Sequence, residues 1–364
     1  MLTESCRHTV RVFQVLLLLA LSQALAGCGA SYLAQATEGQ LGVLRARRPI
    51  GRVLADPSTP DPLRTRLELV LDARAFASSA LALPDNRSYL SYADLRRPYA
   101  VWNVVAAPEF SIQPLRWCFP FTGCLSYRGY FHESSARAFA AELAARGNDT
   151  LVAGVAAYST LGHFADPVLN TMMRYGDLEM VSMIFHELAH QVIYFKGDTQ
   201  FNESFAVTVE QEGLRRWLEA RGRSAELAQF QARQSADARF TRALIEGRAR
   251  LDAIYHEAMA PEAMRERKRE ALAATASQVL ELERQLGWRS GYRSWIDAGL
   301  NNAHLASVAT YSDCIPGFQQ LLAQKGGDLP AFYAAVRRLR RDRAGRATLC
   351  RVRSGEPATA AATP

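Results

Sequence analysis

Residues 177–206 read DLEMVSMIFHELAHQVIYFKGDTQFNESFA, and this stretch predicts two helices joined by a tight turn. Apolar residues dominate its first part, so we expect a buried helix over 177–194. Lys196-Gly-Asp-Thr199 is typical of a turn, and a second helix is expected from Phe201 to Glu219. If the two helices run antiparallel around that turn, His190 of the first faces Glu203 of the second.

The first helix carries the sequence His186-Glu187-Leu-Ala-His190. Two histidines four residues apart lie one above the other on a helix, so both imidazoles can reach one metal ion. Glu187 lies about 100° around the helix, from where its carboxylate can take a proton from an activated water. Three ionisable groups in an apolar helix are costly to bury without such a purpose. The pattern predicts one Zn²⁺ per chain, with Glu187 as the general base of a hydrolytic reaction.

A catalytic zinc ion takes three protein ligands and keeps one open position. Glu203 is the predicted third ligand beside His186 and His190, because the antiparallel arrangement brings it opposite His190. Glu210 is the alternative, since its sequence distance from His190 is closer to that in many other zinc peptidases.

The N-terminus has the order of a secretory signal peptide, which we expect over residues 1–27. Basic residues precede the apolar run Val12–Leu25, which is shorter than the roughly 20 apolar residues of a membrane span. Leu25-Ala-Gly-Cys28 resembles the lipobox of bacterial lipoproteins, in which the cysteine is acylated. We therefore expect a lipid anchor at Cys28, holding the chain to a membrane on the periplasmic side of the cell envelope. Gly29, where an Asp would favour the inner membrane, points to the outer membrane.

Four further cysteines remain in the exported part of the chain, and an even number in an oxidising compartment predicts two disulfides. Cys118 and Cys124 flank a short loop that contains a proline and a glycine, which favours a bridge between them. Cys314 and Cys350 then form the second pair by elimination.

The remaining pattern predicts an α+β chain that is mostly helical, with a small mixed sheet and a helical C-terminal part. The formal net charge is +7, and the arginine-rich segment 337–343 is interpreted as a solvated helix face, with no nucleic-acid partner. The expected organisation is a lipid-anchored tether with a first helix over 28–60, a single catalytic unit over 61–350 (strand-rich 99–165, metal helices 177–220, helical 224–350) and a disordered tail over 351–364.

Asn202-Glu-Ser-Phe-Ala206 resembles the Asn-Glu-Gly-Phe-Ala element of gluzincin aminopeptidases, in which the Glu is the third zinc ligand. The chain as a whole is similar to a bacterial family described as zinc-dependent aminopeptidases. The resemblance implies a zincin-like, gluzincin-type catalytic unit that acts on peptides. Besides the metal motif, the similar segments are Cys118–Cys124, Tyr127–Phe131, Ala157–Gly162, Asp166-Pro167, Lys196–Thr199, Asn301–Ala303, Tyr311 and Gly327–Leu329.

Two features of those enzymes are missing from this sequence. Thermolysin-like members have an Asp four residues after the ligand Glu, supporting a histidine, and that position is Val207 here. The Gly-Ala-Met-Glu-Asn element, whose Glu binds the free amine of the substrate, does not occur. Two alternatives to an aminopeptidase therefore stay open, an envelope endopeptidase and a zinc-binding lipoprotein with little catalysis.

The segment before the metal helix supplies the expected substrate-binding residues. A strand over Leu151–Tyr158 is expected to pair with extended peptide substrate. Ser159 and Thr160 follow it and are predicted to line the cleft. The oxyanion formed during attack needs a donor, for which Tyr158 and Tyr311 are the candidates.

Overall fold

The computed structural model describes residues 29–119, 123–157, 159–312 and 314–351. The chain divides into two compact units, residues 1–46 and residues 47–364. The described part of the first unit is helix α2 (Gly29–Ala46). The predicted signal peptide, the acylation site at Cys28 and the tail from residue 352 lie outside the described residues. Among the described helices, none is long and apolar enough to cross a membrane.

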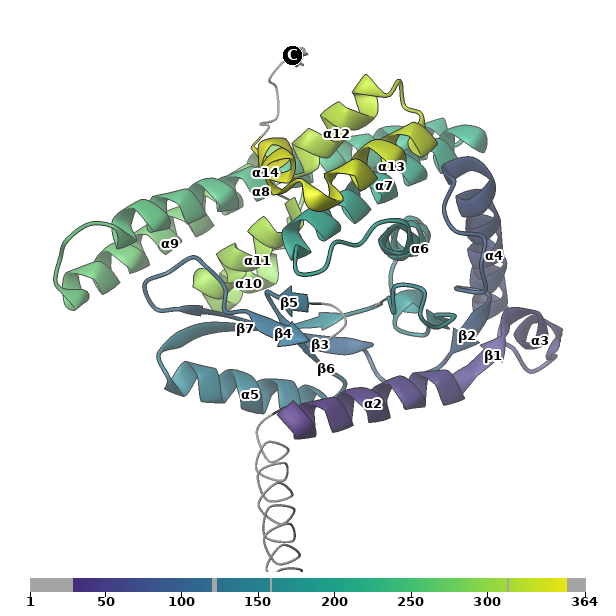
Figure 1. The fold of residues 1–364 in the computed structure, drawn as a ribbon, viewed down its shortest axis with the longest axis horizontal. Coiled ribbons are helices and arrows are strands. Elements are labelled where there is room, and N and C mark those ends of the chain that lie inside the picture. The colour runs from purple at the N-terminus through teal and green to yellow at the C-terminus, as the bar shows by residue number, and fades with distance from the viewer. Residues whose placement is uncertain (1–28, 120–122, 158, 313, 352–364) are drawn as a thin grey trace, which may run out of the picture. The chain divides into compact units, whose positions relative to one another are not determined.

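The second unit is mostly helical, as predicted, and it contains small sheets (Figure 1). Over all the residues that the structure describes, 64% are helical. Its helices are α3 (Ile50–Ala55), α4 (Asp61–Leu81), α5 (Glu133–Ala145), α6 (Asp177–Val192), α7 (Thr199–Ala220), α8 (Ser224–Tyr255), α9 (Pro261–Leu286), α10 (Arg293–Ala298), α11 (Asn302–Ser312), α12 (Ile315–Gln324), α13 (Leu329–Arg338) and α14 (Arg343–Cys350), with short 3-10 turns at Met172–Arg174 and Leu339–Arg341.

The strands form three small sheets, in the orders β1-β2-β8, β6-β3-β7 and β4-β5. The central pair is antiparallel and runs from Val101 opposite Val155 to Pro108 opposite Asn148. Helix α5 lies on one side of this sheet and α11 on the other (Figure 1), which explains why most of β3 is buried. The strands are β1 (Arg47–Pro49), β2 (Ser91–Ala93), β3 (Val101–Pro108), β4 (Trp117–Phe119), β5 (Gly123–Leu125), β6 (Arg128–Tyr130), β7 (Asn148–Val155) and β8 (Val168–Leu169).

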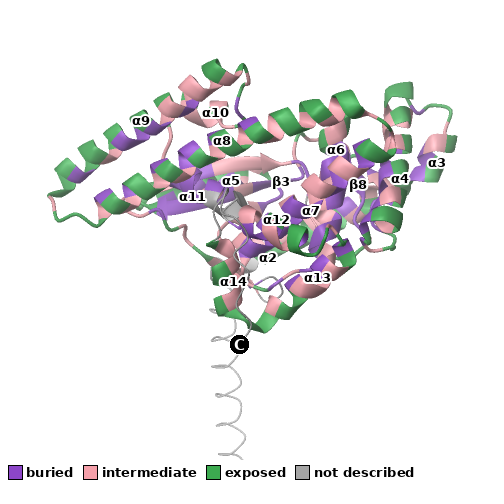
Figure 2. Cartoon of the chain, turned by 90° about the horizontal axis from the view of Figure 1, so that it is seen from above, coloured by how far each residue is buried: buried purple, intermediate pink, exposed green. Residues whose placement is uncertain are grey.

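Helices α6 and α7 form the predicted pair, packed along each other and connected by the turn around Gly197. Gly197 has φ +79°, a left-handed conformation that favours glycine. Further along α7, Gly213 permits close approach to α6, because a Cβ there would lie 2.9 Å from Cδ2 of Phe185. The inner faces of both helices are buried (Figure 2), so the metal motif is held on a rigid, tightly packed support.

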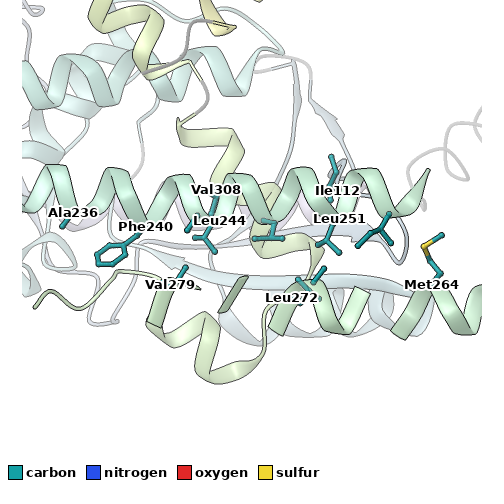
Figure 3. Packing of buried hydrophobic residues seen from close by; sticks show 13 residues of the cluster. Ile112, Ala236, Phe240, Leu244, Leu251, Met264, Leu272, Val279 and Val308 are labelled. Carbon is teal, nitrogen blue, oxygen red and sulfur yellow. The ribbon is translucent and has the colours of Figure 1, made fainter. Parts of the chain in front are cut away.

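The long helices α8 and α9 pack against each other around a hydrophobic core to which Ile112 and Val308 also contribute (Figure 3). Phe240, Leu244 and Leu251 of α8 meet Leu272 and Val279 of α9, and all five are buried. Leu305 and Val308 of α11 belong to the same core, which covers one face of α8. Residues on another face of α8 remain available beside α6 and α7.

Both predicted disulfides are formed in the structure. Cys118 and Cys124 are directly opposite each other in the β4-β5 hairpin. Cys314, just before α12, is bridged to Cys350 at the end of α14.

Candidate metal centre

Three donor atoms from α6 and α7 converge on one point. Oε2 of Glu203 lies 3.4 Å from Nε2 of His186 and 3.6 Å from Nε2 of His190. The ligand atoms of these three residues all lie within 4.8 Å of one another. A tetrahedral zinc ion with bonds of about 2.0–2.1 Å separates its ligand atoms by roughly 3.3 Å. The donor spacing and the donor chemistry therefore fit a single bound ion.

The charges of this group stabilise one another. Burial opposes ionisation of Glu203, yet the neighbouring His190 and His186 hold its pKa well below the ordinary value. Burial likewise opposes protonation of His186, but hydrogen bonds with Glu203 and Glu210 raise its pKa well above the ordinary value. A cation that binds here must displace a proton from the imidazole of His186, so metal affinity falls as the pH is lowered.

Glu210 contacts His186 on the side of the ring opposite Nε2, the nitrogen that faces Glu203. Its Oε2 lies 3.0 Å from Nδ1 of His186. Because a carboxylate only accepts hydrogen bonds, Nδ1 must donate, which leaves Nε2 free to bind a metal ion. The sequence had Glu210 as an alternative ligand, whereas the structure places it behind His186. Glu210 thus provides the carboxylate that supports a histidine, the role that an Asp at the position of Val207 has in thermolysin-like enzymes.

Nδ1 of His190 is buried and has no hydrogen-bond partner among the residues that the structure describes. The histidine pair is therefore asymmetric, since only His186 is oriented by a carboxylate. The rings of the two histidines lie 4.9 Å apart, edge to face.

Glu187 lies next to His186 and lines the same cleft. Burial raises its pKa above the ordinary carboxylate value. The carboxylates of Glu203 and Asp166 raise it further, while the two imidazoles oppose this. A carboxylate with a raised pKa is a stronger base when ionised, which suits a group that takes up and returns a proton.

A cleft of about 1860 Å³ opens over His186 and Glu187. It is larger than the roughly 300–1,000 Å³ of typical small-molecule pockets, so it can take a peptide. One wall is a face of α8, another is formed by α6 and α7, and the end of β7 forms part of its edge.

The outer edge of β7 faces this cleft at Gly154. Val155 points toward β3, because its C=O accepts a hydrogen bond from the N–H of Ala100. Neighbouring residues of a strand alternate in direction, so Gly154 directs its N–H and C=O away from β3. The C=O of Thr150 follows the same alternation and accepts from the side chain of Asn301. The cleft is thus bordered by backbone groups that suit an extended peptide.

The predicted substrate-binding hydroxyls form hydrogen bonds within their own loop. Oγ1 of Thr160 donates to Asp166 at 2.8 Å, and Oγ of Ser159 accepts from the N–H of Leu161 at 3.0 Å. Asp166, whose electrostatic effect on Glu187 the sequence did not reveal, holds this loop through its hydrogen bonds with Thr160. A role of these hydroxyls in substrate binding stays a prediction. Tyr158 and the side chain of Tyr311 lie outside the described residues.

Comparison with known proteins agrees with a hydrolase that acts on peptides. A family model described as "Putative aminopeptidase" matches residues 31–348. The chain belongs to this family, which covers both metal helices, the β3-β7 sheet and the α8-α9 hairpin. No curated protein and no solved structure matches the chain.

Proposed function

We propose that this protein is a zinc-dependent aminopeptidase with a gluzincin-like metal centre. The observation that carries the proposal is the convergence of His186, His190 and Glu203 on one point, beside a cleft that His186 and Glu187 line. Family membership supports the peptide substrate. The expected occupant is one Zn²⁺ per chain.

The residues around the ion have separate tasks in this proposal. When bound, zinc supplies Lewis-acid activation of water and of the scissile carbonyl. Glu187 accepts the proton of the attacking water and returns it to the leaving amine. The outward backbone groups of Gly154 hold the substrate extended, and Glu210 keeps His186 in the correct tautomer.

The decisive comparison is between the wild type, Glu187→Gln and His190→Ala, each assayed for zinc content and peptide cleavage. We expect one zinc per chain in the wild type and in Glu187→Gln, and loss of zinc in His190→Ala. Cleavage should fall about 10²- to 10⁴-fold in Glu187→Gln, the usual contribution of a general base. A wild type that binds no zinc would refute the proposal, whereas zinc without cleavage would favour a zinc-binding lipoprotein.

A peptide with an acetylated N-terminus separates the two kinds of peptidase. An aminopeptidase should release N-terminal residues from the free peptide and leave the acetylated one intact. Internal cleavage of both peptides would favour the envelope endopeptidase.

We further propose that the protein is a lipoprotein of the cell envelope, anchored at Cys28 and facing the periplasm. The two disulfides support an oxidising compartment. Incorporation of labelled fatty acid into the wild type but not into Cys28→Ser tests the anchor, and membrane fractionation tests the preference for the outer membrane.

A further inference from the structure

An aminopeptidase must bind an ammonium group next to the bond that it cuts. Removing that charge from water without a partner is unfavourable by several kcal/mol, so an anionic side chain is needed beside the metal centre. Glu203 is proposed to bind the metal ion and Glu187 to transfer the proton, so neither carboxylate is available to the ammonium group. This inference rests on the proposed function and asks which remaining carboxylate takes that role.

Asp166 lies near Glu187, but its carboxylate is already used. One oxygen accepts from the N–H of Thr160 at 2.9 Å and the other from the hydroxyl of Thr160 at 2.8 Å. Asp166 is only 4% exposed and does not line the cleft. It therefore serves the loop and is closed to substrate.

Glu179 lines the cleft but is too far along α6. It lies seven residues before His186, which is about 10.5 Å along a helix at 1.5 Å per residue. The amine of the first substrate residue must lie within one residue of the scissile bond, and one extended residue spans only about 3.3 Å. Glu179 therefore contributes a negative charge to the same cleft, but its carboxylate is too far from the scissile bond to bind the substrate amine.

Glu210 meets each requirement. It lines the cleft together with His186, and its side chain is 27% exposed. His186 contacts only Oε2 of Glu210. Because a carboxylate has about four acceptor positions, Oε1 of Glu210 can accept further hydrogen bonds. Among the described residues, no lysine or arginine forms an ion pair with Glu210. Its charge is available to a cation that enters from the cleft.

We propose that Glu210 binds the N-terminal ammonium of the peptide through Oε1 while Oε2 orients His186. Oε2 of Glu210 lies 3.0 Å from Nδ1 of His186, so one imidazole ring separates the carboxylate from Nε2, the nitrogen proposed to bind the metal, and the ammonium is bound on the Nδ1 side of that ring. The substrate class is peptides with a free amino terminus. An acetylated peptide has no positive charge to offer this carboxylate, so it binds without that ion pair.

The test uses two metal-chelating ligands that differ only in the amine, leucine hydroxamate and isocaproyl hydroxamate. Their dissociation constants are measured by calorimetry on the zinc-loaded wild type, on Glu210→Gln and on Glu179→Gln. A glutamine at position 210 keeps an acceptor for Nδ1 of His186 but has no charge for the ammonium. Glu179→Gln is the matched control, since it removes a negative charge from the same cleft.

In the wild type we expect leucine hydroxamate to bind about 10- to 100-fold more tightly than isocaproyl hydroxamate, the usual worth of a charged hydrogen bond. The ratio should fall close to one in Glu210→Gln, with isocaproyl hydroxamate bound as in the wild type, and persist in Glu179→Gln. An unchanged ratio in Glu210→Gln, or equal weakening of both ligands, would overturn the inference and leave Glu210 as a positioning residue only.

Zinc content measured on each sample separates this inference from the proposed function. A wild type that holds zinc and binds both hydroxamates, with equal affinity, refutes the amine site alone. A wild type that holds no zinc and binds neither ligand refutes the proposed function, and the inference with it.

Discussion

Removal of the Cys314–Cys350 disulfide should destabilise the protein more than removal of Cys118–Cys124. Both bridges close loops, but the loops differ in length, with sequence separations of 36 and 6 residues. A crosslink restricts the unfolded chain more strongly when the closed loop is longer.

The chain-entropy relation gives about 4 kcal/mol for the 36-residue loop and about 2 kcal/mol for the 6-residue loop at 25 °C. The long loop also joins structure near the metal centre. The N–H of Cys314 donates to the hydroxyl of Ser204, the neighbour of Glu203, and Cys350 lines the cleft. Loss of this bridge should therefore loosen one wall of the site as well.

The assay is urea unfolding of the wild type and of two double variants, Cys314→Ala with Cys350→Ala and Cys118→Ala with Cys124→Ala. The free energy of unfolding in water should fall by about 4 and about 2 kcal/mol respectively, with similar slopes. Equal losses, or a larger loss for the short loop, would show that native-state contacts rather than loop entropy set the stabilisation.

Three further predictions concern pH, packing and the support of the metal ligand. Burial lowers the pKa of His304 to about 4, so the unfolded state binds more protons between pH 4 and 6.5. Stability should therefore fall by about 3 kcal/mol as the pH drops through that window, and His304→Asn should remove this part in pH-dependent urea titrations. Gly213→Ala should destabilise the protein by about 1–3 kcal/mol by thermal unfolding, because the new methyl group overlaps Phe185. Glu210→Ala should weaken zinc binding about 10- to 100-fold in chelator competition. Val207→Asp in that background should restore part of the lost affinity, because it returns a carboxylate to the same face of α7.

The helix pair could be predicted from the sequence almost to the residue. Helices expected over 177–194 and 201–219 are observed over 177–192 and 199–220, because apolar periodicity and a glycine turn are local signals. The strand expected over 151–158 begins at Asn148 instead, directly after Gly147 with φ +80°.

The arrangement of the sheets could not be predicted. β3 pairs with β6 and β7, which lie further along the chain, and three separate small sheets form where one was expected. Such pairings depend on contacts between segments that are distant in the sequence, and a local sequence pattern does not encode these contacts.

The division of residues 224–286 into the two helices α8 and α9 follows from the break before Pro261.

The candidate metal ligands could be identified in the sequence because their spacing follows directly from helix geometry, but the carboxylate that contacts His186 from behind could not. A helix advances 100° per residue, so a carboxylate seven residues after Glu203 returns to within 20° of it, whereas one four residues later is displaced by 40°. Both positions can face α6, and only the structure shows that Glu210 occupies this role while Val207 is part of the cleft wall. The longer Glu side chain is well suited to the more distant position. The departure from the thermolysin pattern is therefore a relocation of the supporting carboxylate along the same helix face, and at position 210 this carboxylate also borders the cleft.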